Sequence, residues 1–218
     1  MKYWSIVVFC VIFVLTLFVG IYSTGMATKI YNQIVNAYQN VKESIANLET
    51  EYQRRYALID NLVIIVKETK SFEQYLLNFE KDVYTQVAEA KASATKLDIV
   101  LPEEVKRRVK KESNLTNLVT TLLDKILVMA QHYPSISDPQ IKEHTETIKS
   151  LQQLRSELKD IEQNILNSRQ ELNQTTKLYN VQINLFPANI IAKITNYKEL
   201  SFFEVIDQEA REDVKIKF

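Results

Sequence analysis

The stretch "IVNAYQNVKESIANLETEYQRRYALIDNLVIIVKET", residues 34–69, decides the fold because apolar side chains recur in it with a helical period. Alternating steps of four and three residues from Ile34 place these side chains along one side of an α-helix. This seam consists of Ile34, Tyr38, Val41, Ile45, Leu48, Tyr52, Arg55, Ile59, Leu62, Val66 and Thr69. It predicts one long helix with a buried face, on which Arg55 is the single charged member. Arg54 is about 100° further around the helix, so we expect it to reach the flank or solvent.

Three further apolar seams follow in the sequence and are separated by prolines. They are Phe72, Leu76, Phe79, Val83, Val87, Ala90, Ala94 and Leu97; Leu115, Val119, Leu122, Ile126, Met129 and Tyr133; and Leu151, Leu154, Leu158, Ile161, Ile165, Ser168, Leu172, Thr175, Tyr179 and Ile183. Pro102 suits a first helical turn, and Pro134 ends a helix before Pro139 begins the next. Short connections between long helices favour antiparallel neighbours. We therefore expect an all-α chain with an antiparallel four-helix bundle over residues 26–187.

The segment that follows the predicted bundle, residues 188–218, has a mixed pattern. The "FPAN" motif at residues 186–189 ends the fourth helix, and a short amphipathic helix is predicted after it. An aromatic cluster of Tyr197, Phe202 and Phe203 then precedes a polar end. We expect this segment to form a short helix and a tail.

The amino-terminal stretch "WSIVVFCVIFVLTLFVGIY", residues 4–22, contains no charged residue. A helix of this length spans about 28 Å, close to the hydrocarbon thickness of a bilayer. Residues 1–25 are therefore predicted to be a transmembrane anchor. A cleaved signal peptide is the alternative, but its apolar region usually has only about 7 to 15 residues. Lys2 before the stretch and Lys29 after it leave the orientation of the anchor undecided.

Composition excludes several classes of protein. The 218 residues have a formal net charge of zero, which does not favour nucleic acid as a partner. The chain has one cysteine and therefore no internal disulfide. Its two glycines, Gly20 and Gly25, both lie in the first 25 residues, so no glycine-rich phosphate loop follows.

The polar residues form no recognisable catalytic or metal-binding motif. His132 and His144 lie 12 residues apart without the spacing of a metal site. Serines and threonines lack an identifiable histidine and acid partner. We therefore expect no catalytic residue, no metal and no cofactor. The basic stretch "KRRVKK", residues 106–111, is flanked by glutamates and is interpreted as a mixed-charge surface, with contact to anionic lipids as the alternative.

A series of short motifs runs along nearly the whole chain in a fixed order. They are Tyr31-Asn32, "RRYALIDNLV" with Lys67, Tyr133-Pro134, Glu162, Ile165, Arg169, Tyr179-Asn180, Phe186-Pro187, Ile191-Ala192 and a valine four residues before the closing Phe218. In this order and spacing the chain resembles the LemA family. The resemblance implies a bacterial cell-membrane protein with a single amino-terminal transmembrane helix and an antiparallel helical bundle. The molecular function of that family is not established.

Arg55 requires a partner, because a buried cation without one is costly. We predict that Arg55 pairs with Glu162 of the fourth helix as a structural polar pin. The whole pattern favours a non-catalytic interaction or scaffold protein at the bacterial envelope, with the bilayer and another membrane or envelope protein as partners. Two alternatives stay open. One is a polar core site for a small ligand or metal that uses Arg55 with Glu162 or Asn180, and the other is a passive spacer.

Overall fold

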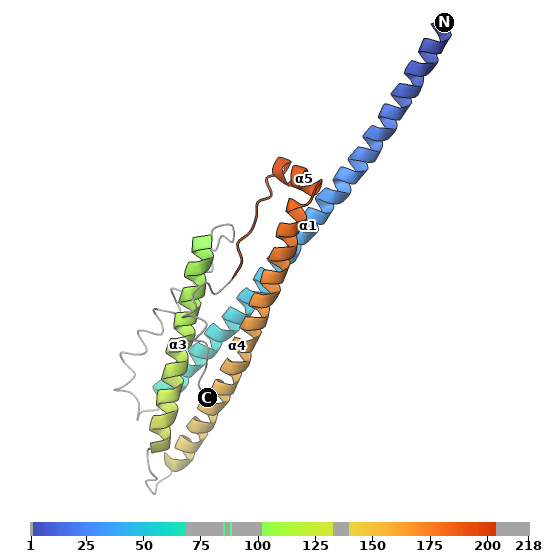
Figure 1. Ribbon diagram of the computed structural model, residues 1–218. Helices are drawn as coiled ribbons and strands as arrows, with labels where there is room; N and C mark the ends of the chain where they lie inside the picture. The colour runs from blue at the N-terminus through green and yellow to red at the C-terminus, as the bar shows by residue number, and fades with distance from the viewer. Residues whose placement is uncertain (1, 69–84, 86–87, 89–101, 133–139, 204–218) are drawn as a thin grey trace. The chain divides into compact units, whose positions relative to one another are not determined.

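The computed structural model describes residues 2–68, 85, 88, 102–132 and 140–203. All regular elements in these ranges are helices, so the prediction of an all-α chain is confirmed for them (Figure 1). They are α1 (Lys2–Glu68), α3 (Pro102–His132), α4 (Gln140–Asn184) and α5 (Ala188–Ile194). The helix predicted from the second seam lies outside the described residues, apart from Thr85 and Ala88, which are helical.

Helix α1 continues without a break from the apolar stretch into the first seam. Its amino-terminal part is long and apolar enough to cross a membrane, and the side chains in its apolar window are not buried by the rest of the chain. Hydroxyl groups in this part donate to backbone carbonyls of their own helix, for example Thr16 Oγ1 to Phe13 O at 2.8 Å. Ser23, Thr24 and Thr28 form bonds of the same kind, which satisfy these hydroxyl donors without water. The predicted anchor is thus a candidate membrane span.

The chain forms two compact units. Unit 1 comprises Met1–Lys42 and Thr175–Glu199, and unit 2 comprises Glu43–Gln174 and Leu200–Phe218. Each of the long helices α1 and α4 contributes to both units.

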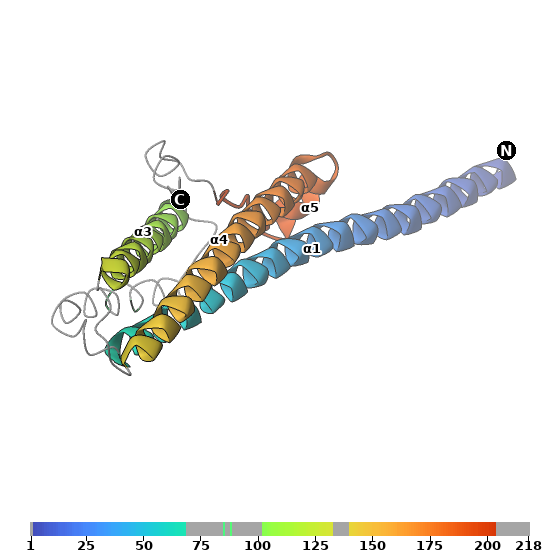
Figure 2. The same ribbon diagram turned by 90° about the horizontal axis from the view of Figure 1, so that it is seen from below.

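In unit 2 the contacts define the directions of three helices. Glu49 of α1 contacts Arg108 of α3. Arg55, which lies further along α1, contacts Glu112, which lies further along α3. Helices α1 and α3 therefore run in the same direction. On α4 the order is reversed, because Arg169 contacts Tyr52 and the earlier Glu162 contacts Arg55. Helix α4 is therefore antiparallel to α1 and α3. Figure 2 shows α4 alongside the carboxyl-terminal half of α1.

The apolar core of unit 2 follows the predicted seams closely. Side chains buried in it include Leu48, Tyr52, Ile59 and Leu62 of α1, Leu115, Val119, Leu122 and Ile126 of α3, and Leu151, Leu154, Leu158, Ile165 and Leu172 of α4. Their burial removes apolar surface from water and stabilises the helices against one another. The connection that contains Pro134 and Pro139 lies outside the described residues.

In unit 1 the helices meet around three tyrosines. The rings of Tyr38, Tyr179 and Tyr197 have centroids 5.6 to 6.5 Å apart, and the Tyr179 hydroxyl donates to Lys198 O at 2.8 Å. Burial raises the pKa of Tyr179 to about 12, so its phenol stays protonated at neutral pH. These contacts join α1, the end of α4 and the segment after α5.

Helix α5 ends in a turn that places Tyr197 in this cluster. Asn196 adopts a φ of 60°, a left-handed conformation that asparagine tolerates better than most residues. The amide of Tyr197 then donates to Ala192 O at 2.9 Å, and the amide of Asn196 donates to Lys193 O at 3.4 Å. This is the Schellman pattern of helix termination.

Candidate functional site

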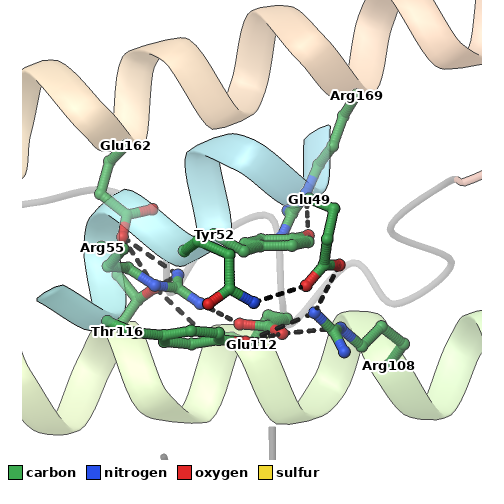
Figure 3. Close-up of polar contacts among 10 residues, drawn as sticks. Glu49, Tyr52, Arg55, Arg108, Glu112, Thr116, Glu162 and Arg169 are labelled. Atoms are coloured by element: carbon green, nitrogen blue, oxygen red, sulfur yellow. Dashed lines mark hydrogen bonds and ion pairs between the residues drawn. The ribbon is translucent and has the colours of Figure 1, made fainter. Parts of the chain in front are cut away.

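Charged and polar side chains form a cluster at the junction of α1, α3 and α4 within unit 2 (Figure 3). We call it the charge cluster and define it as Tyr52, Arg55, Tyr56, Arg108, Glu112, Thr116, Glu162 and Arg169. Five of its members are buried in the core, namely Tyr52, Arg55, Tyr56, Arg108 and Glu112, whereas Thr116, Glu162 and Arg169 are half-buried at its edge. Arg55, Arg108 and Glu112 are at most 1% exposed.

Arg55 contacts both neighbouring helices. Its Nη1 donates to Glu162 Oε1 of α4 at 3.1 Å and to Thr116 Oγ1 of α3 at 2.6 Å. Its Nη2 is ion-paired with Glu112. The Thr116 hydroxyl in turn lies 3.1 Å from Glu162 Oε1, to which it can donate. Arg55 thus joins the three helices through charge-assisted hydrogen bonds, which are stronger than bonds between neutral groups.

Glu112 is shared by two arginines. Besides Arg55, it pairs with Arg108 of its own helix, whose Nε lies 2.6 Å from Glu112 Oε1. The Tyr56 hydroxyl donates to the same carboxylate oxygen at 2.7 Å. Arg108 also reaches α1, where its Nη2 donates to Glu49 Oε2 at 3.1 Å. Glu112 is therefore shared by two buried cations, each of which has a second acidic partner: Glu162 for Arg55 and Glu49 for Arg108.

Tyr52 lies among the guanidinium groups. The guanidinium carbons of Arg55, Arg108 and Arg169 lie 5.2, 5.0 and 5.8 Å from the centroid of its ring. These distances are within the range of cation–π attraction. The Tyr52 hydroxyl accepts hydrogen bonds from Arg169 Nε at 3.1 Å and Nη2 at 2.9 Å. The ring and its hydroxyl therefore hold an arginine of α4 against α1.

The protonation states in the cluster follow from burial and neighbouring charge. Burial raises the pKa of Tyr52 more than Arg169 lowers it, so the phenol stays neutral at physiological pH. The pKa of Tyr56 is raised by burial and by Glu112. Burial alone would lower the pKa of Arg55, but Glu162 and Glu112 outweigh burial and the pKa lies above its ordinary value. The cluster therefore holds charged arginines beside neutral phenols.

The structure brings together the two residues that the sequence pairs, Arg55 and Glu162. Arg54 is 59% exposed at its side chain and pairs with Glu51 of the same helix, which is the predicted asymmetry between the adjacent arginines. Asn180, considered above as a further polar core residue, belongs to unit 1 and is not part of the cluster.

Sequence reasoning missed Glu112 and Arg108. The interpretation of residues 106–111 as a mixed-charge surface is wrong for Arg108, which is 1% exposed. The signal was present in the spacing, because residues 108 and 112 continue the α3 seam backwards from Leu115 in helical steps. The prediction holds for Lys106, Arg107 and Lys110, which are exposed.

Comparison with known proteins agrees with the resemblance found in the sequence. The sequence model of the LemA family matches residues 44–218, which include the charge cluster. The chain belongs to the LemA family. This confirms the resemblance for most of the chain.

Curated relatives of this LemA-family chain are magnetosome proteins. Magnetosome protein MamQ of Magnetospirillum gryphiswaldense is 22% identical over 79% of this chain and 64% of its own length. Magnetosome proteins MamQ 2 and MamQ 1 of Paramagnetospirillum magneticum are each 22% identical over 80% of this chain and 64% of their own length. The chain therefore spans about 64% of the length of these relatives.

The described part of this LemA-family chain contains no arrangement suited to metal binding. No group of three or more His, Cys, Asp or Glu side chains in it is placed to hold a metal ion. Unit 2 does contain a groove of about 380 Å³ between α1 and α4, lined by Asn61, Ile64, Ile65, Ser150, Gln153, Leu154 and Glu157. Its single acid, Glu157, accepts a hydrogen bond from Gln153 at 2.8 Å. The groove lining has no second titratable group to act as an acid–base partner.

A short segment after α5 is bound to α4 near the charge cluster, within unit 2. Asn173 makes a double contact with Phe203, because the Phe203 amide donates to its Oδ1 at 2.6 Å and its Nδ2 donates to Phe203 O at 3.3 Å. Leu200 and Phe203 are buried, whereas Phe202 is exposed. The predicted aromatic cluster is therefore divided between the two units. Phe202 and Phe203 belong to unit 2, and Tyr197 belongs to unit 1.

Replacing Asn173 by alanine is expected to weaken the attachment of this segment by about 1–3 kcal/mol, because the backbone groups of Phe203 lose their partners. Amide hydrogen exchange of the full-length protein measures this as faster exchange at Phe203. Asn167→Ala is the matched control, since Asn167 is exposed and contacts only its own helix through Gln163 in the described contacts. Equal exchange at Phe203 in both variants would show that the double contact does not hold the segment.

Proposed function

We propose that this LemA-family protein is a non-catalytic scaffold, anchored in the bacterial cell membrane by one pass of α1, that binds another membrane or envelope protein. The observation that supports this proposal is that the buried arginines of the charge cluster are paired with acids of the chain itself. Arg55 and Arg108 are ion-paired with Glu112 and with acids of a neighbouring helix. The groups that would otherwise bind an anionic ligand or transfer a proton are thus engaged in holding the helices together.

We also infer that residues 72–97 supply the second helix of an antiparallel four-helix bundle. Helices α1 and α3 run in the same direction within unit 2, so the chain between Glu68 and Pro102 must return along their length. A helix over the second seam would span about 39 Å, which is enough for that return. The bundle would bury its seam, as the other seams are buried.

Site-specific photo-crosslinking in native membranes tests the scaffold proposal. The crosslinking side chain is placed at one exposed position on each helix of unit 2: Gln53 of α1, Thr121 of α3 and Leu166 of α4. We expect at least one of these positions to give a discrete adduct with a single membrane or envelope protein, which reciprocal capture through that protein then verifies. A crosslinker at Val14, in the candidate span, is the matched control for contact with lipid.

The two alternatives make different predictions in the same experiment. A passive spacer gives no protein adduct at any of the three positions. A polar core site for a small ligand would make partner binding depend on Arg55, so an Arg55→Met variant that stays folded would lose its adduct. The scaffold proposal expects the folded Arg55→Met variant to keep it.

A further inference from the structure

Helix α5 buries small side chains and exposes large apolar ones, which is unusual for a helix in water. Its alanines, Ala188 and Ala192, are 4% and 3% exposed, whereas Ile190 and Ile194 on the opposite side are 51% and 79% exposed. The preceding Leu185 and Phe186 are 55% and 81% exposed. Exposed apolar side chains that are grouped in this way mark a surface that contacts something other than water. We call Leu185, Phe186, Ile190 and Ile194 the apolar elbow.

The apolar elbow belongs to the same unit as the candidate membrane span. Tyr197, which the turn after α5 holds in place, forms a side-chain hydrogen bond with Tyr31 of α1. The uncharged run of α1 extends from Tyr3 to Thr28 and is about 39 Å long, close to the thickness of a bilayer with its headgroups. Tyr31 is only three residues beyond this run. The segment after α5 therefore meets α1 at the level where the span leaves the lipid.

The charge of unit 1 also suits a lipid surface. Residues 1–42 and 175–199 contain six lysines and a single acid, Glu199; the lysines are Lys2, Lys29, Lys42, Lys177, Lys193 and Lys198. Because the whole chain has no net charge, the compensating acids lie in the remaining sequence. Lysines close to a membrane surface attract anionic headgroups, and their long side chains can reach the headgroups from an apolar neighbourhood.

We propose that the apolar elbow inserts into the bilayer interface beside α1, as a second membrane contact that is stabilised by anionic lipid headgroups. The partner is the lipid surface, because the segment that follows the elbow contacts α1 next to the candidate span and the surrounding charge is almost purely positive. The apolar side chains would enter the boundary between headgroups and acyl chains, as those of interfacial helices do. This inference rests on the membrane anchor of the proposed function, but not on its protein partner.

Fluorescent labelling of single cysteines in the full-length protein tests the proposal. The protein is reconstituted into vesicles of phosphatidylcholine and phosphatidylglycerol whose lipids carry nitroxide quenchers, at a shallow position in one preparation and at a deep position in another. Cys10, the only cysteine of the chain, lies in the span and serves as the positive control. Ile190→Cys and Ile194→Cys are then labelled in a Cys10→Ser background, and Leu166→Cys, at an exposed leucine of unit 2, is the matched negative control.

We expect strong quenching at Cys10, Ile190→Cys and Ile194→Cys, and none at Leu166→Cys. Quenching at Cys10 without quenching at the two elbow positions would overturn this inference and leave the anchor intact. Absence of quenching at Cys10 itself would overturn the anchor and the inference together. The labels at Ile190→Cys and Ile194→Cys could instead be exposed to water in lipid vesicles and shielded from water only in native membranes. That result would show that a protein covers the elbow, and it would overturn the lipid contact.

A second pair of variants separates insertion from mere proximity to the membrane. A label at Phe186→Cys is combined with Ile190→Ser and Ile194→Ser, which remove the apolar side chains from exposed positions without opening the core. We expect this combination to lose the quenching of the Phe186→Cys label, whereas Leu166→Ser should leave it unchanged. Quenching that survives the loss of both isoleucines would contradict insertion.

Discussion

Replacing Glu112 by glutamine is expected to lower the free energy of unfolding by about 3–5 kcal/mol, the usual cost of breaking a buried ion pair by removing one partner. Glutamine keeps the size of the side chain but removes the charge that offsets both Arg55 and Arg108. Its amide group would also present a donor to guanidinium groups that need an acceptor. Denaturant unfolding of the full-length protein in detergent, followed by circular dichroism, measures the loss.

Asp124→Asn is the matched control for Glu112→Gln. Asp124 also forms an ion pair between helices, with Arg155 at 2.9 Å, but its side chain is 42% exposed and that of Arg155 is 39% exposed. Solvent-exposed pairs contribute about 0–1 kcal/mol. The expected order is therefore a large loss for Glu112→Gln and a small one for Asp124→Asn. Similar losses in the two variants would refute the assignment of Glu112 as the central acceptor of the cluster.

Replacing Tyr52 by alanine is expected to have an effect of similar size, about 3–5 kcal/mol, as for other buried aromatic residues reduced to alanine. The side chain is 1% exposed and its ring lies within cation–π distance of three arginines. Its loss would leave a cavity and would also remove the hydroxyl that accepts two hydrogen bonds from Arg169. The same unfolding measurement applies.

Tyr52→Phe divides this effect into its parts. Phenylalanine keeps the ring and the packing but removes the acceptor of Arg169, and a hydrogen bond to a charged group contributes about 1.5–3 kcal/mol. We expect Tyr52→Phe to be less destabilising than Tyr52→Ala. If the two variants were equally unstable, the hydroxyl contact would account for the whole effect and the ring would contribute little to the cluster.

Much of the fold was predictable because helical periodicity is a local property. The steps of four and three residues from Ile34 already select Val41, Leu48, Tyr52 and Ile59, which are all buried. The helix beginning at Pro102 and the helix ending before "FPAN" were also predictable, since proline acts on the backbone of its immediate neighbours. The uncharged stretch at the amino terminus required only its length and composition.

The charge cluster was predictable only in part. Arg55 was identifiable because it is the single charge on its own seam, and Glu162 was proposed as its partner from the fourth helix. Arg108 lies within a run of basic residues, so its burial is hidden by neighbours that face solvent. Which acid would meet Arg55 depends on the register between α1 and α3, and no residue of either helix alone specifies that register.

The sequence by itself determined the helices, their apolar faces and the candidate span, because each depends on residues within a few turns of one another. The tertiary structure alone decided that Glu112 is shared by two arginines, that Asn173 binds Phe203, and that α5 buries alanines while it exposes isoleucines. These contacts join residues that are distant along the chain. Their geometry exists only after the helices have packed, since packing sets the register and rotation of each helix against the others.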